Sequence, residues 1–255
     1  MPCTLAQLVN LTDETLQPQR FKDYCPNGLQ VEGRSEVSRI VTGVTACQAL
    51  LDAAIDQQAD VILVHHGYFW RGESPVLTGN RLKRIKSLLD NGISLLGYHL
   101  PLDAHPEYGN NAGLANVLGF SVQGNAPSVE QDLLMLGELG EPMSGGELST
   151  HIAACLGRPP LHIAADPLET RKLRSVAWCT GGAQGYIEKA IELGVDAYIT
   201  GEVSEQTVHS ARESGMHFYA AGHHATERYG VQALGAYLAA ALGLEHQFID
   251  IDNPA

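Results

Sequence analysis

Apolar and polar residues follow two patterns that alternate along the chain and predict strands and helices in turn. Continuous apolar runs rich in β-branched residues, at residues 39–46 and 59–67, are typical of strands buried on both faces. Apolar residues at helical spacing follow, at residues 47–58 and 80–91. Strands that alternate with helices in this way predict an α/β fold with mainly parallel sheets.

The same patterns assign the rest of the chain. We expect strands at residues 39–46, 59–67, 94–105, 131–139, 161–166, 175–183, 196–203, 216–224 and 246–251. We expect helices at residues 5–16, 47–58, 80–91, 110–118, 147–156, 184–193, 205–213 and 225–242. Gly92 follows the third of these helices in the usual position of a C-terminal cap.

The order of elements in the first part of the chain recurs in the last part. In both parts a strand, a helix, a strand, a helix and a strand follow one another, and a histidine stands just past the third strand. We therefore predict two similar α/β halves, residues 1–120 and 147–255, that pack as one unit. A weaker stretch rich in glycine and proline, residues 121–146, connects them. Duplication and the convergence of two ordinary βαβ halves both explain the similarity.

Composition and charge narrow the class of protein. The chain has 255 residues, 44% hydrophobic and 18% charged, as globular proteins do. Its formal net charge of −13 argues against binding duplex nucleic acid by charge, because lysine and arginine supply that affinity. No apolar stretch approaches the ~20 residues that span a bilayer. An odd number of cysteines without a CxxC motif, and no signal-peptide pattern, predict a reduced cytoplasmic protein without membrane contact.

Side chains that bind metals gather at the ends of the predicted strands. His65 and His66 end one apolar strand, and Asp103 follows the next. His223 and Glu227 are four residues apart, a spacing that puts both on one face of a helix. Ligands of open α/β sheets bind outside the carboxyl ends of the strands. We therefore expect these five side chains to form one metal site at the strand tips, between the two halves.

The number of ligands predicts two ions. Three imidazoles and two bridging carboxylates supply about seven bonds, for two ions that each bind roughly four to six ligands. Water or substrate completes the coordination, so the site is open. Imidazole with carboxylate suits divalent transition metals such as zinc, iron or manganese better than calcium or magnesium. At these acidic strand ends, we expect only the ions to supply positive potential for an anionic substrate.

Several short motifs occur in the order found in a known family. They are PNGLQVEG, VTGV, VHHG, HLPLDAH followed by GNN, ITGE and GHHATE. In these motifs the chain resembles the Nif-three-like family, whose members are also labelled type 2 homologues of GTP cyclohydrolase I. The resemblance covers nearly the whole chain and points to the short members, which lack a middle insert domain. It implies two similar α/β halves, a ring-shaped hexamer, and metal ligands at His65, His66, Asp103, His223 and Glu227.

Other residues near the strand ends have two interpretations each. Glu202, at the strand tip equivalent to His66, lines the site or lies outside it. His99 orients a metal ligand or caps its strand. The loop at residues 179–185 lies between a strand and a helix and lacks the lysine of a P-loop, so a phosphate site and a structural turn are equally expected. The aromatic residues 68–70 are expected to pack a loop or a subunit contact rather than stack on a base.

These features favour a dinuclear metal-dependent hydrolase that acts on a small, nucleotide-like substrate. The ions activate a bridging water, and Glu202 or His99 moves protons. GTP ring opening, as in the family label, and phosphoester hydrolysis are both compatible. The alternative is a non-enzymatic metal-binding oligomer that serves as a scaffold or regulatory protein. The open coordination favours the enzyme.

Overall fold

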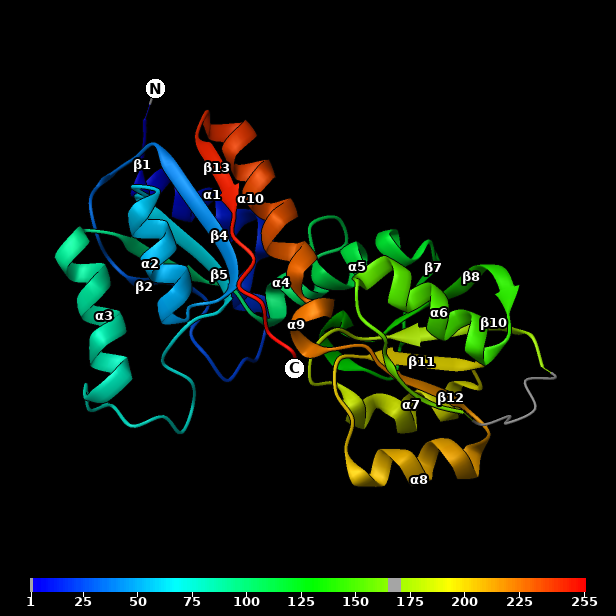
Figure 1. Ribbon diagram of the computed structural model, residues 1–255. Coiled ribbons are helices and arrows are strands. Elements are labelled where there is room, and N and C mark those ends of the chain that lie inside the picture. The colour runs from blue at the N-terminus through cyan, green and yellow to red at the C-terminus, as the bar shows by residue number, and fades with distance from the viewer. Residues whose placement is uncertain (1, 165–170) are drawn as a thin grey trace. The chain divides into compact units, whose positions relative to one another are not determined.

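The computed structural model describes residues 2–164 and 171–255, which form two compact units (Figure 1). Unit 1 contains the chain up to Gly109 and the segment Arg228–Asp252. Unit 2 contains Asn110–Glu227 and Asn253–Ala255. Each unit is built on a sheet with a parallel centre and antiparallel additions. This architecture confirms the α/β class that the sequence predicts.

The sheet of unit 1 has the strand order β13-β4-β5-β6-β2. These strands are β2 (Gly28–Val31), β4 (Arg39–Thr45), β5 (Val61–His66), β6 (Ser94–Gly97) and β13 (Glu245–Phe248). All neighbours pair in parallel except β2, which is antiparallel to β6. The other elements are β1 (Cys3–Thr4), α1 (Leu5–Leu16), η1 (Pro18–Arg20), β3 (Glu36–Val37), α2 (Gln48–Asp56), α3 (Gly79–Asn91), α4 (Leu100–Ala104) and α10 (Arg228–Leu242).

The central strand β5 of unit 1 is apolar from Val61 to Val64, and each face of its sheet has its own core. Val61 and Leu63 of β5 pack with apolar residues of α1 and α10. Ile62 and Val64 pack with apolar residues of α2 and α3. Successive residues of a strand point to opposite faces, so helices on both sides bury both sets of β5 side chains.

The sheet of unit 2 has the strand order β7-β8-β10-β11-β12-β9. These strands are β7 (Ser121–Asn125), β8 (Met135–Met143), β9 (Leu161–Ile163), β10 (Leu173–Trp178), β11 (Ala197–Thr200) and β12 (His217–Ala220). β10, β11 and β12 are parallel, and the outer strands are antiparallel. The other elements are α5 (Asn110–Leu118), η2 (Glu130–Asp132), α6 (Gly145–Leu156), η3 (Gln184–Tyr186), α7 (Ile187–Leu193), α8 (Glu205–Ser214) and α9 (His223–Thr226). Within the described ranges of both units, no helix has the length and apolar character needed to cross a membrane.

One carboxylate joins the starts of neighbouring parallel strands in each unit. The Asp60 carboxylate, just before β5, accepts hydrogen bonds from two main-chain N–H groups at the start of β4 (2.8 and 3.0 Å). The Asp196 carboxylate, just before β11, accepts them from the N–H groups of Arg174 (2.9 Å) and Ser175 (3.0 Å) in β10. This shared contact supports the repeat that the sequence pattern indicates.

The helix before each repeated segment begins with the same kind of cap. Thr4 and Gln7 form a capping box at the start of α1, and Ser144 and Glu147 form one at the start of α6. In each box a hydroxyl accepts from the third helical N–H, and the side chain at that position accepts from the main chain of the cap residue. Both helices then precede an antiparallel edge strand, β2 or β9.

Two single-turn helices differ from the sequence prediction. The strand expected at residues 94–105 ends at Gly97, and Pro101 stands in the first turn of α4, where its missing N–H removes no helical hydrogen bond. The helix expected at residues 225–242 is interrupted at Glu227, which has φ −110° and ψ 10°, between α9 and α10. A helix of four or five residues is too short to produce a hydrophobic period.

The middle of the chain also differs in detail. The strand expected at residues 131–139 is shifted to Met135–Met143. The strand expected at residues 161–166 ends at Ile163, and residues 165–166 lie outside the described residues. An additional strand, β7, pairs with β8. Residues 121–146, expected as a connection, therefore contribute two strands to the sheet of unit 2.

The compact units do not follow the expected halves, residues 1–120 and 147–255. α10 and β13 come from the last part of the chain but belong to unit 1. β13 pairs with β4, and Val231 and Leu234 of α10 lie in the same core as β5. Without β13, β4 would be an edge strand with unpaired main-chain groups.

Replacing Asp196 by asparagine should lower the stability of unit 2 in a pH-dependent way. Burial opposes ionisation, but hydrogen bonds from the N–H groups of Arg174 and Ser175 hold the pKa of Asp196 below its ordinary value. A carboxylate with a lowered folded-state pKa adds stability above its unfolded pKa, and this stability is lost as the pH falls through the folded pKa. We expect a loss of about 1 kcal/mol near pH 7 and less below about pH 4, measured by urea unfolding.

The matched control for this change is Glu213→Gln, which alters an exposed carboxylate of α8. It should leave the unfolding free energy unchanged across the same pH range. An equal loss for Asp196→Asn at both ends of the range would contradict the role of the charge.

Candidate metal centre

Two histidines end β5 with their rings in contact. The ring centroids of His65 and His66 are 4.5 Å apart, and Nδ1 of His65 lies 3.0 Å from the carbonyl oxygen of Tyr98. A carbonyl oxygen only accepts, so Nδ1 of His65 donates and Nε2 carries the lone pair that a metal requires. Nε2 lies 3.3 Å from a carboxylate oxygen of Asp103 on α4. Unit 1 thus brings His65 against two other predicted ligands.

His99 lies beside this pair and is held by a carboxylate. One potential ligand atom from each of His65, His66 and His99 lies within 4.8 Å of the others. Nδ1 of His99 is 2.9 Å from Asp23, which also accepts from the N–H of Leu100 (3.0 Å). Burial raises the pKa of Asp23, but its hydrogen bonds and the charge of His99 lower it well below the usual range. His99 therefore lines the candidate site, and its side chain makes no cap hydrogen bond to α4.

Asp23 is a site residue that the sequence analysis does not single out. The motif PNGLQVEG contains the signal, because Asn27 in it contacts both Asp23 (3.0 Å) and the main-chain N–H of His99 (2.7 Å). Cys25, Asp23 and His99 form a second group of potential metal ligands. Burial and the negative charge of Asp23 raise the pKa of Cys25 to about 12. The potential metal ligands of unit 1 therefore include imidazoles, carboxylates and this thiol.

His223 in unit 2 lies between two carboxylates. Nδ1 of His223 is 2.7 Å from Glu202, which follows β11, and Nε2 is 3.1 Å from the buried Glu227. Burial lowers the pKa of His223, but hydrogen bonds and charges of Glu227 and Glu202 raise it to about 9. The two carboxylates that stabilise a positively charged His223 also produce a negative potential, which favours a bound cation. A carboxylate on Nδ1 with Nε2 directed elsewhere is how proteins orient a metal-binding histidine.

A glycine-rich loop, residues 179–185, passes directly over Glu227. A side chain at Gly181 would place its Cβ 2.0 Å from Oε1 of Glu227, so only glycine fits at this position. The Thr226 hydroxyl accepts from the N–H of Gly181 (3.0 Å), and the Thr200 hydroxyl donates to its carbonyl oxygen (3.0 Å). Because hydrogen bonds inside unit 2 hold the loop, it acts as a structural turn over the ligands.

Glu202 and His66 occupy equivalent positions in their units, as the sequence predicts. The main chain just past the third parallel strand binds the carbonyl oxygen of Val64 in unit 1 (3.0 Å) and of Thr200 in unit 2 (2.7 Å). His66 and Glu202 each follow that residue by two positions. The contact with His223 places Glu202 in the candidate site.

The aromatic residues after the histidine pair pack locally. The Tyr68 hydroxyl donates to the carbonyl oxygen of Ala46 (2.9 Å), and the Trp70 ring lies 5.0 Å from His99. Phe69 is 37% exposed. Tyr68 and Trp70 therefore support the loop beside the site, and Phe69 faces outward.

Each of the two α/β units carries imidazole and carboxylate groups at the carboxyl ends of its parallel strands. The fold and these side chains define the class: an α/β protein with clusters of potential metal ligands. The chain belongs to the Duf34/NIF3 (NGG1p interacting factor 3) family, whose model matches residues 3–254. The match confirms the resemblance that the motifs carry.

The chain is similar to proteins of this family along its whole length. A relative from Pseudomonas aeruginosa, "GTP cyclohydrolase 1 type 2 homolog", is 59% identical over 256 residues, covering 100% of both chains. The solved structure of protein ybgI has a TM-score of 0.95 at 55% identity and covers 99% of this chain and 100% of its own. TTHA1606 from Thermus thermophilus has a TM-score of 0.88 at 31% identity, with the same coverage.

Replacing Gly181 by alanine should weaken metal binding. The new Cβ would collide with Glu227 and meet Nε2 of His223 at 3.1 Å. We expect wild-type protein purified without chelator to hold about two transition-metal ions per chain, and the variant to hold about one or fewer. Elemental analysis measures the ions, and circular dichroism checks the fold.

The control for this experiment is Gly185→Ala in the same loop, where an added Cβ meets nothing within 4 Å. It should keep the full metal content. A wild-type content near zero after reconstitution with zinc, iron or manganese would contradict the metal centre itself.

Proposed function

We propose that this protein is a dinuclear metal-dependent hydrolase that acts on a small, nucleotide-like substrate. The observation that carries the proposal is the matching pair of histidine and carboxylate in each unit. His65 directs Nε2 toward Asp103 in unit 1. His223 directs Nε2 toward Glu227 in unit 2. In both histidines an oxygen atom holds Nδ1, which is the donor geometry of transition-metal sites.

The proposed metal ligands are His65, His66 and Asp103 from unit 1, with His223 and Glu227 from unit 2. If two ions were bound, three imidazoles and two carboxylates would supply about seven bonds, and each ion needs roughly four to six. Divalent zinc, iron or manganese fits this mixture of nitrogen and oxygen. When bound, such ions lower the pKa of a water molecule and polarise the bond that the water attacks.

Glu202 and His99 are the proposed proton-transfer groups. The side chain of Glu202 is 44% exposed and hydrogen-bonds His223, so it connects the site to solvent. His99 is nearly buried, and the ionised Asp23 fixes its ring beside the histidine pair. A carboxylate open to solvent can take a proton from the attacking water and release it.

The nucleotide-like substrate is supported by the name of the relatives, which refers to GTP cyclohydrolase. Ring opening of GTP and hydrolysis of a phosphoester both require an activated water. Both also develop negative charge, which cations stabilise. The proposed ions would both activate the water and stabilise the negative charge.

Replacing Glu202 by glutamine tests the enzyme against a metal-binding scaffold. The amide keeps the size of the side chain and an oxygen acceptor for Nδ1 of His223 but removes the base. We expect both metals to remain bound and the turnover rate to fall about 10²- to 10⁴-fold, measured with GTP and a phosphoester panel. Glu205→Gln, an exposed change at the start of α8, is the control and should retain full activity. No turnover by metal-loaded wild-type protein across the panel would favour the scaffold.

We also propose that the chain assembles into a homohexamer and works in the cytoplasm. Several large apolar side chains between residues 69 and 89 are exposed, including Val76 (61%), Leu89 (59%) and Leu82 (45%). Exposed apolar side chains that form one contiguous patch mark a contact surface. An odd number of cysteine residues is typical of proteins from reducing compartments.

A double change in this exposed segment, Val76→Asp with Leu77→Asp, should break the assembly. Light scattering should give the wild-type protein about six times the chain mass of 27.4 kDa, and the variant a smaller multiple. Val122→Asp, at a position in unit 2 that is 50% exposed, is the control and should keep the wild-type mass. A wild-type protein that is monomeric at micromolar concentration would refute the hexamer.

A further inference from the structure

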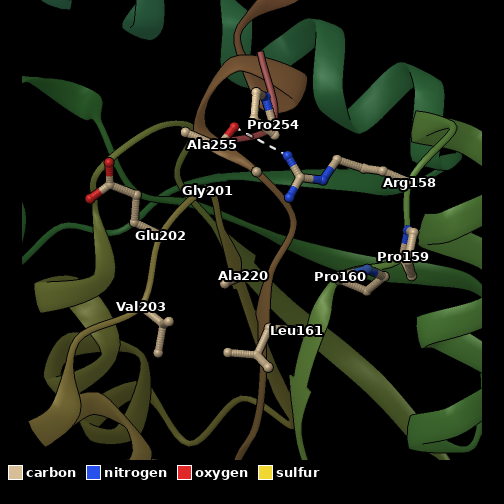
Figure 2. A pocket seen from close by; sticks show the side chains of 11 residues that line it. Arg158, Pro159, Pro160, Leu161, Gly201, Glu202, Val203, Ala220, Pro254 and Ala255 are labelled. Atoms are coloured by element: carbon tan, nitrogen blue, oxygen red, sulfur yellow. Dashed lines mark hydrogen bonds between the residues drawn. The ribbon is translucent and has the colours of Figure 1, made fainter. Parts of the chain in front are cut away.

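Unit 2 contains an open pocket of about 590 Å³ beside the candidate site (Figure 2). Pro160, Leu161, Val203 and Ala220 give part of its lining an apolar character. Pockets of this volume accommodate ligands as large as a nucleotide. The shape and the apolar lining suit the body of a small organic molecule.

The basic side chain in the described lining is Arg158, which follows the end of α6. Its guanidinium lies against the main chain of Gly222, where an added Cβ would come within 2.4 Å of Nη1. Nη1 donates a hydrogen bond to the main-chain oxygen of Ala255 (3.1 Å), drawn as a dashed line in Figure 2. The main-chain N–H of His224 donates to the same oxygen (3.3 Å). Two donors from separate segments of unit 2 therefore converge on one oxygen acceptor.

Glu202 connects this pocket to the candidate metal centre. It lines the pocket and also hydrogen-bonds Nδ1 of His223 at 2.7 Å. A ligand in the pocket is thus separated from a proposed metal ligand by one side chain. From the sequence, only bound ions are expected to supply positive potential here, and Arg158 is a second source of positive charge.

We propose that this pocket binds the body and a remote oxyanion of the substrate, and that the oxyanion displaces Ala255, whose main-chain oxygen now accepts from Arg158 and from the N–H of His224. The ligand class is a small organic anion of nucleotide size, and the end of the molecule that reacts extends past Glu202. This inference rests on the proposed function and names the part of the chain that selects the substrate. A guanidinium suits phosphate or carboxylate oxygens because its N–H groups form charge-assisted hydrogen bonds.

The test compares GMP, guanosine and inorganic phosphate by calorimetry with the full chain, both metal-loaded and after treatment with chelator. In chelated protein, Arg158 is the basic side chain among the described residues that line the pocket. We expect Arg158→Gln to weaken GMP binding at least about tenfold and to leave guanosine binding unchanged. The glutamine keeps much of the packing on Gly222, Arg158→Lys should restore part of the affinity, and Arg212→Gln on exposed α8 is the matched control. Metal content, measured in parallel, should be the same in all variants.

Each outcome separates this pocket from the hydrolase proposal. Equal GMP affinity in wild type and Arg158→Gln, or no GMP binding by the wild type at millimolar concentration, overturns the pocket. Inorganic phosphate that binds as tightly as GMP also overturns it, because the apolar lining would then contribute nothing. Turnover whose kcat/KM is insensitive to Arg158→Gln keeps the hydrolase and removes the pocket. Binding that depends on Arg158 without turnover keeps the pocket and removes the hydrolase.

Discussion

A strand covered by helices on both faces of its sheet must be apolar along its length, and this constraint decides where chemistry can occur. β5 is apolar from Val61 to Val64 because its side chains enter two separate cores. Polarity begins at His65, where the strand leaves both cores. β11 is likewise buried through Thr200, and Glu202 follows it. The proposed metal ligands of each unit therefore lie at the ends of its strands or in and beside the short helices that follow.

The same constraint explains which features the sequence predicts. An apolar run that turns abruptly polar marks a strand end, so His65 and Glu202 can be placed from the sequence alone. Asp23 and Arg158 give no such signal, because tertiary contacts with His99 and with Gly222 bring them to their places. The single turns α4 and α9 are too short for a helical period. The return of α10 and β13 to unit 1 depends on strand pairing that no local pattern records.

The two units share the same arrangement of parallel strands, but the proposed metal ligands stand at different positions in each. Asp60 and Asp196 join the strand starts in the same way. His65 and His66 end the second parallel strand of unit 1, whereas Glu202 follows that strand in unit 2 and the proposed ligand His223 follows the third. That exchange requires Gly201, where an added Cβ would lie 2.6 Å from Cα of His223. The absence of a side chain at Gly201, after β11, thus leaves space for His223, after β12.

Unit 1 is assembled from two stretches of chain, with the main segment of unit 2 between them. During synthesis, Asn110–Glu227 leaves the ribosome before β13, so unit 2 has nearly all of its chain while the first sheet still lacks a strand. Until Glu245–Phe248 arrives, β4 presents its main-chain groups at an open edge, and pairing over so long a separation is slow. The sheet whose strands begin the chain is therefore completed after the other sheet, and in the interval its open edge needs shielding from other chains.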